Sequence, residues 1–241
     1  MPQHVPEVEW TEDALELRKF VFDYWGENRR APNLAAMHAG TGIERRRLVE
    51  ALKLLQLGIV FVIDETSPNC DILKAPPFSA FPSQVEMFID GEFHSYIGCA
   101  HEGIGVSWTP YFRGKEVELR TYDAHTLEPI TLVSKDFKLI SAEPSEPLIL
   151  CTEVIWDWVN TDMKHMCDHT NFVLNRENGA AYEASIGRRG IYFTVDQVAE
   201  YISFVLNIRI YDYHWPALSM DPPMIIDRLR ELDIDLSPWG L

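Results

Sequence analysis

The chain has 241 residues, of which 46% are hydrophobic and 12% aromatic, so it can bury a full core without disulfides or structural metals. Its 21 basic and 37 acidic residues give a net charge of −16 at pH 7, which disfavours nucleic acids and anionic membranes as partners. The sequence shows no signal peptide and no apolar stretch long enough to cross a bilayer. We therefore expect a cytoplasmic protein that binds neither nucleic acid nor membrane.

Residues 1–75 have the pattern of a small helical unit followed by a β-hairpin. Apolar residues recur at helical spacing after a possible N-cap at Thr11 and again within residues 43–57. Two short strand-like runs follow, with a Ser-Pro-Asn turn between them. Three helices and a hairpin are the pattern of a winged helix. Arg45 to Arg47 would lie on the recognition helix of a DNA-binding member, but a solvated helix face explains them and the acidic balance favours a structural cap or lid.

The pattern changes after a proline-rich segment, residues 76–82, which predicts a linker. Asp90-Gly91 between two alternating runs predicts a tight hairpin. KEVELRTYD and EPITLVS predict a second strand pair, and EPLILCTEVI and MCDHTNFVLN are further strand candidates. A helix is expected from Thr194, with Gln197 completing a capping box.

Together these elements predict an α+β fold. We expect a winged-helix-like helical domain at residues 1–75 and a linker at residues 76–82. Residues 83–212 would form an α+β domain with a mixed or antiparallel β-sheet and flanking helices, expected to carry the chemistry. Residues 213–241 would be a C-terminal extension.

The four cysteines lie far apart and form no Cys-x-x-Cys pair. In a reducing compartment, scattered cysteines are more often buried small residues or reactive thiols than disulfides. They are Cys70, Cys99, Cys151 and Cys167.

The first candidate site is Cys99-Ala100-His101-Glu102. If a helix begins at Cys99, Cys99 and Glu102 lie one turn apart on the same face, and the positive end of the helix dipole favours the Cys99 thiolate. A carboxylate held there can accept the thiol proton and later deliver it elsewhere. The Cys-x-x-Glu spacing is a weak pattern, however, and a buried cysteine beside a surface glutamate explains it more simply.

The second candidate site is the run His165-Met166-Cys167-Asp168-His169. In a strand, His165, Cys167 and His169 would share one face. Two imidazoles flanking a thiolate could bind zinc or copper, or lower the pKa of the thiol. A strand with one exposed polar face is the alternative.

Several segments resemble the organomercurial (alkylmercury) lyases. CAHEGIGVSWTPYF and VELRTYDAHTLEPITLV resemble the core of that family, in which a Cys-x-x-Asp motif opens a buried helix, and HMCDHTNFV resembles its Phe-Cys-Cys-His-x-His-Phe-Phe segment. By position, Cys99 and Cys167 match the two catalytic cysteines, and Glu102 stands in place of the catalytic aspartate. Two further departures are Asp168, in place of the second cysteine of the pair, and Asp123, in place of a structural cysteine. The family's N-terminal winged-helix-like unit does not bind DNA.

The resemblance implies protonolysis of a carbon–mercury bond without an organic cofactor, releasing a hydrocarbon and mercury(II). Cys99 and Cys167 would hold the mercury, or an adventitious soft metal, and Glu102 would pass a thiol proton to the carbon. The further candidate ligands are His165, Asp168 and His169. Apolar residues that would suit an alkyl or aryl group, or equally form plain core, are Ile104, Val106, Trp108 and Phe172.

The same resemblance implies a small organometallic substrate, a role in detoxification, and small thiols or a metal-accepting protein that remove the product. Two alternatives stay open. One is a divergent family member that cleaves a different carbon–metal or carbon–heteroatom bond. The other is a non-enzymatic soft-metal-binding or sensing protein.

Overall fold

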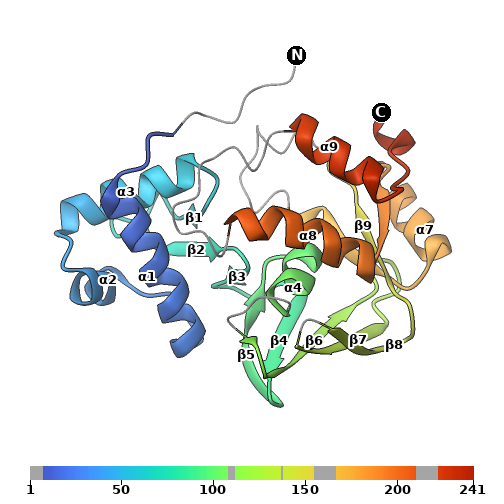
Figure 1. Ribbon diagram of the computed structural model, residues 1–241, viewed down its shortest axis with the longest axis horizontal. Helices are drawn as coiled ribbons and strands as arrows, with labels where there is room; N and C mark the ends of the chain where they lie inside the picture. The colour runs from blue at the N-terminus through green and yellow to red at the C-terminus, as the bar shows by residue number, and fades with distance from the viewer. Residues whose placement is uncertain (1–7, 108–111, 137, 155–166, 210–221) are drawn as a thin grey trace.

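The structure is a computed structural model, and it describes residues 8–107, 112–136, 138–154, 167–209 and 222–241. It is an α+β fold, as predicted, with helices around antiparallel strands (Figure 1). The described helices are α1 (Glu12–Asn28), α2 (Leu34–Thr41), α3 (Arg45–Leu57), α4 (Ala100–Ser107), α7 (Arg176–Ile186), α8 (Val195–Arg209) and α9 (Pro222–Glu231). The described strands are β1 (Val62–Ile63), β2 (Ile72–Ala75), β3 (Phe78–Ser79), β4 (Val85–Ile89), β5 (Glu92–Ile97), β6 (Glu116–Tyr122), β7 (Pro129–Lys135), β8 (Lys138–Glu143), β9 (Leu148–Cys151), β10 (Thr170–Val173) and β11 (Ile191–Thr194).

Among the described residues, two antiparallel sheets are present. The larger has the strand order β1-β2-β3-β5-β4-β6-β7-β8, and the smaller has the order β10-β9-β11. The β4–β5 hairpin turns at Asp90 and Gly91, whose φ angles of 51° and 83° are those that an Asp-Gly turn provides. Strands β6 and β7 pair along their whole length, so both predicted strand pairs are confirmed.

Two predicted helix caps are also present. The Thr11 hydroxyl accepts a hydrogen bond from the Ala14 N–H at 3.2 Å, which begins α1. Before α8, the Thr194 hydroxyl accepts from the Gln197 N–H at 3.2 Å, and the Gln197 side chain accepts from the Thr194 N–H at 2.9 Å. This reciprocal pair is the capping box expected from the sequence.

Two local predictions need correction. Residues Cys167 and Asp168 are helical, and β10 begins only at Thr170, so Cys167 does not alternate with its neighbours along a strand. Five residues with two possible periods are too few for sequence pattern to distinguish helix from strand. The expected linker, residues 76–82, contains β3, which pairs with both β2 and β5. Pro76 and Pro77 lie in the turn that reverses the chain between β2 and β3, and Pro82 follows β3.

The N-terminal helices pack directly on the larger sheet. The Trp25 ring of α1 stacks on the Phe78 ring of β3, with centroids 5.5 Å apart. His94 of β5 places its Nε2 2.9 Å from the Gly26 carbonyl oxygen. One hydrophobic core contains residues of α1, the larger sheet and α9, and the division of the chain into the predicted domains stays a prediction.

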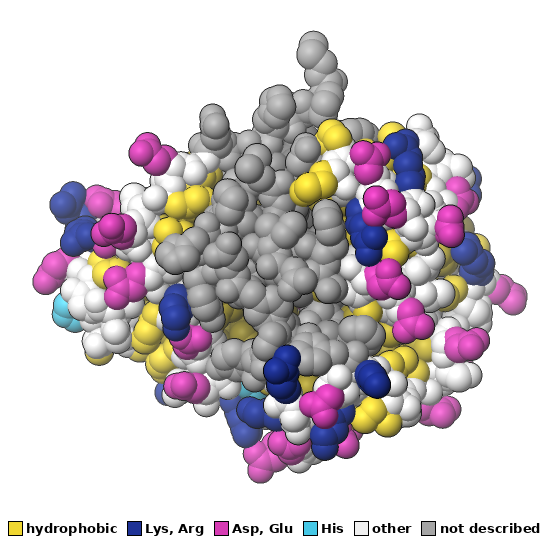
Figure 2. Space-filling view, viewed as in Figure 1, with side chains coloured by type: hydrophobic (Ala, Val, Ile, Leu, Met, Phe, Trp, Pro, Cys, Tyr) yellow, Lys and Arg dark blue, Asp and Glu magenta, His cyan; other side chains and the backbone are white. Residues whose placement is uncertain are grey.

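The three arginines of α3 all contact acceptors within the protein. Arg45 donates to the Pro68 carbonyl oxygen at 2.7 Å and Arg46 pairs with Glu50 at 3.0 Å. Arg47 reaches Asp13 at 2.5 Å. On the described part of the face in Figure 2, acidic side chains are interspersed with basic ones. Each arginine thus has a partner within the protein, and the absence of nucleic-acid binding stays a prediction. No helix among the described residues is both long and apolar enough to span a membrane.

Candidate functional site

The structure brings together three residues that the sequence had placed in two separate motifs. The Cys99 sulfur, the Cys167 sulfur and a Glu102 carboxylate oxygen all lie within 4.8 Å of one another. Cys99 immediately precedes α4, and its carbonyl oxygen accepts from the Gly103 N–H at 2.9 Å. Helix α4 packs against β4, β5, β10 and α8, and its contact with β10 brings it close to the short helical segment that carries Cys167.

A glycine allows this close approach. A Cβ atom on Gly98 would lie 1.9 Å from Glu102 Oε2 and 3.3 Å from the Cys167 sulfur. The first distance is far below any van der Waals contact, so the Glu102 carboxylate occupies the space that a side chain at position 98 would fill. Gly98 joins the end of β5 to Cys99, and its lack of a side chain therefore determines where Glu102 can lie.

The Cys167 thiol and the Glu102 carboxylate form a donor–acceptor pair. The Cys167 sulfur donates toward Glu102 Oε1 at 3.4 Å. The hydrogen bond with Cys99, burial, and electrostatic interactions with the acidic groups Cys99 and Glu102 raise the pKa of Cys167 well above its usual value. Cys167 is therefore a thiol at neutral pH, and a soft metal that displaces its proton would do so beside a carboxylate that can accept it.

Lys74 is a member of the site that sequence reasoning missed. It lies on β2 with a side chain only 1% exposed, and its Nζ is 3.4 Å from the Gly98 carbonyl oxygen. Burial acts to lower the pKa of Lys74, but electrostatic interactions with the acidic groups Cys167, Glu102, Cys99 and Asp168 outweigh burial, and the pKa lies above its usual value. The available signal was strand alternation, which places Lys74 on the same face as the buried Ile72.

The apolar surroundings of the two cysteines come largely from the N-terminal part of the chain. Ile59, Val62 and Leu73 pack with the two cysteines in a cluster separate from the main core. The sequence had suggested other residues for this role. Trp108 lies outside the described residues, and the main core contains the rest: Ile104, Val106 and Phe172.

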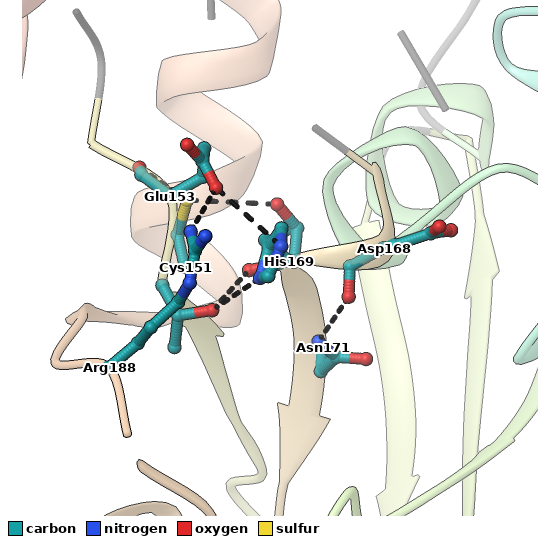
Figure 3. A network of polar contacts seen from close by, with 8 residues as sticks. Cys151, Glu153, Asp168, His169, Asn171 and Arg188 are labelled. Atoms are coloured by element: carbon teal, nitrogen blue, oxygen red, sulfur yellow. Dashed lines mark hydrogen bonds and ion pairs between the residues drawn. The ribbon is translucent and has the colours of Figure 1, made fainter. Parts of the chain in front are cut away.

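The other proposed ligands lie in different surroundings. His169 belongs to a polar network in which its Nε2 is 3.6 Å from Glu153 and its Nδ1 is 3.1 Å from the Thr152 hydroxyl. Arg188 pairs with the same Glu153 carboxylate at 2.6 Å, and Figure 3 shows the Asp168 carboxylate pointing away from this network. His165 lies outside the described residues. Among the residues that are described, the Cys–Glu–Cys group is the one set of three potential ligands close enough to share one ion.

His101 is poorly suited to replace Glu102 as a proton donor at neutral pH. Its ring packs against Phe193 and Tyr201, with centroid distances of 4.9 and 5.5 Å. Burial lowers the pKa of His101 to about 3, so the imidazole is neutral at pH 7 and is a far weaker acid than a protonated carboxyl group. Its role is packing between α4 and the β11–α8 segment.

Asp123 links the two sheets. Its carboxylate accepts hydrogen bonds from the backbone N–H groups of His125 and Thr126 within its own turn, at 2.8 and 2.7 Å. It also accepts from the Leu174 N–H at 2.6 Å and the Asn178 side chain at 3.1 Å. Asp123 is fully buried, and its contacts make it a structural residue.

Comparison with known proteins identifies a similar fold. The crystal structure of the mercury-bound form of MerB2 superposes on this chain with a TM-score of 0.64, covering 79% of this chain and 88% of that one at 17% sequence identity. At this identity the likeness concerns the fold. No protein-family model matches the chain. No curated protein sequence matches it significantly.

Proposed function

We propose that the protein cleaves carbon–mercury bonds by protonolysis. The observation that carries this proposal is the group of two buried cysteine sulfurs and one carboxylate oxygen within 4.8 Å of one another. Thiolates are soft ligands that prefer soft metals such as mercury, and a carboxylate beside them can act as acid and base. The similarity in fold to a mercury-bound protein supports the same substrate class.

In the proposed reaction, an organomercury cation arrives bound to a small thiol. Cys99 replaces that thiol on the mercury, and the Cys99 proton leaves with the small thiol. Cys167 then binds the mercury, and its proton passes to Glu102, which it already contacts. Two thiolates increase the electron density on the carbon, and Glu102 donates its proton there. The carbon–mercury bond breaks with its electron pair on carbon, the hydrocarbon leaves, and mercury(II) remains on the two sulfurs.

Small thiols or a metal-accepting protein would then remove the mercury(II), and the reaction needs no organic cofactor. A cytoplasmic role in mercury detoxification is the biological setting that we propose for this chemistry. Cleavage of another carbon–metal bond by the same group would need the same proton transfer, so the choice of substrate is a matter for direct assay.

The direct test is release of benzene from phenylmercury by the purified protein in excess small thiol, measured by gas chromatography. We expect repeated turnover, and we expect Cys99→Ser and Cys167→Ser to abolish it. Cys70→Ala is the matched control, because Cys70 is also buried but belongs to the main core. Tight retention of mercury without any benzene would contradict the proposal and indicate a metal-binding protein.

Replacing the proposed acid separates binding from cleavage. Glu102→Gln should still hold mercury through both sulfurs, but benzene release should fall by at least about 10²-fold, as on loss of a general acid. Glu102→Asp keeps a carboxylic acid and should retain part of the activity or exceed it. Release of benzene by Glu102→Gln at the parental rate would remove this role from Glu102.

A further inference from the structure

The placement of Lys74 gives the candidate site a fixed positive charge. Its Nζ lies 3.4 Å from the carbonyl oxygen of Gly98, and the Cα of that same residue faces Glu102 and Cys167. The ammonium group is therefore separated from the reacting groups by a single residue. With 1% of its side chain exposed, it has little contact with water to screen its charge.

A buried ammonium is costly unless negative charge lies nearby. The Glu102 and Asp168 carboxylates provide this charge, and the sulfurs of Cys99 and Cys167 add to it once they are thiolates. Its contact with the Phe81 ring, at 5.7 Å from the ring centroid, adds a weaker attraction. Lys74 is thus a counter-charge for whatever anion forms at the Cys–Glu–Cys group.

The charge at that group depends on which form of mercury is bound. Two thiolates with one organomercury cation form an adduct of charge −1. Two thiolates with mercury(II) form a neutral complex. This difference in net charge follows from the charges of the thiolates and the mercury species. It distinguishes the substrate-bound state from the product-bound state in the proposed function.

We propose that Lys74 is a specificity-determining residue that holds the anionic two-thiolate adduct of an organomercury cation in preference to the neutral mercury(II) complex. Before Glu102 passes its proton to the carbon, the ammonium of Lys74 attracts the anionic adduct. After Glu102 has passed its proton to the carbon, the negative charge resides on the Glu102 carboxylate. Lys74 then attracts that carboxylate and no longer attracts the neutral mercury complex. The same charge would therefore favour retention of the substrate and release of the product. This inference rests on the proposed function for its substrate class.

The test compares retention of phenylmercury and of mercury(II) by Glu102→Gln protein, in competition with a small thiol. Adding Lys74→Met removes the charge while keeping an unbranched side chain of similar length. We expect retention of phenylmercury to weaken by about tenfold or more, because opposite charges interact strongly where water is excluded, and retention of mercury(II) to change much less. Both complexes use the same two thiolates, so any change in thiol ionisation cancels in the ratio.

Two further variants keep the test decisive. Lys74→Arg keeps the charge and should keep the preference for phenylmercury, provided that thermal unfolding shows a folded protein. Lys53→Gln on the exposed face of α3 is the matched control and should leave both affinities unchanged. Equal weakening of both ligands by Lys74→Met, or loss of the preference in a folded Lys74→Arg protein, would overturn the inference and leave Lys74 a purely structural role.

The two proposals fail separately. If the parent protein binds phenylmercury but releases no benzene, the proposed cleavage fails, and the Lys74-dependent preference can still be measured by binding. If benzene is released and Lys74→Met leaves the ratio of the two affinities at its parental value, the cleavage stands and the role of Lys74 fails.

Discussion

At the scale of single residues, the candidate site depends on Gly98. Because a Cβ there would lie 1.9 Å from Glu102 Oε2, Gly98→Ala must displace the carboxylate from the two sulfurs. We expect benzene release to fall by about 10²-fold, the cost of displacing a reacting group by about 1 Å. Both cysteines remain in this variant, so mercury(II) should still bind, and mercury retention measured beside benzene release distinguishes displacement from unfolding.

Gly103→Ala is the matched control for this prediction. Gly103 lies on the same helix, but a Cβ there would meet the ends of flexible side chains, the nearest being Leu119 at 3.2 Å. Small adjustments of those side chains can accommodate a methyl group, so benzene release should stay near the parental value. Equal activity in Gly98→Ala would show that the position of Glu102 is not important for cleavage.

At the scale of the elements, Asp123 connects the β6–β7 turn to the segment that joins β10 and α7. Its four hydrogen-bonding partners lie in both segments, and the carboxylate is fully buried. We expect Asp123→Ala to lower the free energy of unfolding by about 2–4 kcal/mol, because four residues lose the charged acceptor that they share. Urea unfolding at pH 7 measures this change, and a loss below about 0.5 kcal/mol, typical of a surface substitution, would contradict it.

The same carboxylate predicts a pH dependence. Burial acts to raise the pKa of Asp123, but hydrogen bonds from Leu174, Thr126, Asn178 and His125 outweigh it, and the pKa lies below its usual value. A lowered folded-state pKa adds stability above the unfolded-state pKa of about 4, and this stability is lost as the pH falls through the folded-state value. The difference in stability between the parent and Asp123→Asn should therefore shrink below about pH 4.

Elements with strong local signals could be predicted from the sequence. Three such features depend on only a few neighbouring residues, and the structure contains all of them: the Thr11 N-cap, the Asp90-Gly91 turn and the Thr194 capping box. Spacing alone also put Cys99 and Glu102 on one turn of a helix. The helical state of Cys167 and the position of Lys74 depend on contacts between distant segments, which local periodicity does not encode.

At the scale of the whole molecule, a single core joins parts of the chain that the sequence pattern separates. The core contains Leu17 of α1, Leu119 of β6 and Leu229 of α9, all almost completely buried. The N-terminal part also provides the lysine and the apolar neighbours of the two cysteines. The candidate site therefore depends on packing between that part and the rest, even though its three reacting groups all follow residue 98.

The Trp25–Phe78 stack is the contact that tests this dependence. Trp25 is 1% exposed, and its ring lies 5.5 Å from that of Phe78 at an interplanar angle of 16°. Trp25→Ala should lower the free energy of unfolding by about 3–5 kcal/mol, as for other large core truncations. Leu57→Ala is the control, since that side chain is 54% exposed and its loss should change stability by less than about 0.5 kcal/mol. Because one hydrophobic core includes residues from both ends of the described chain, circular dichroism and tryptophan fluorescence should report the same unfolding transition for each variant. An early transition confined to the N-terminal helices of Trp25→Ala, with benzene release unchanged, would show that the site does not need this packing.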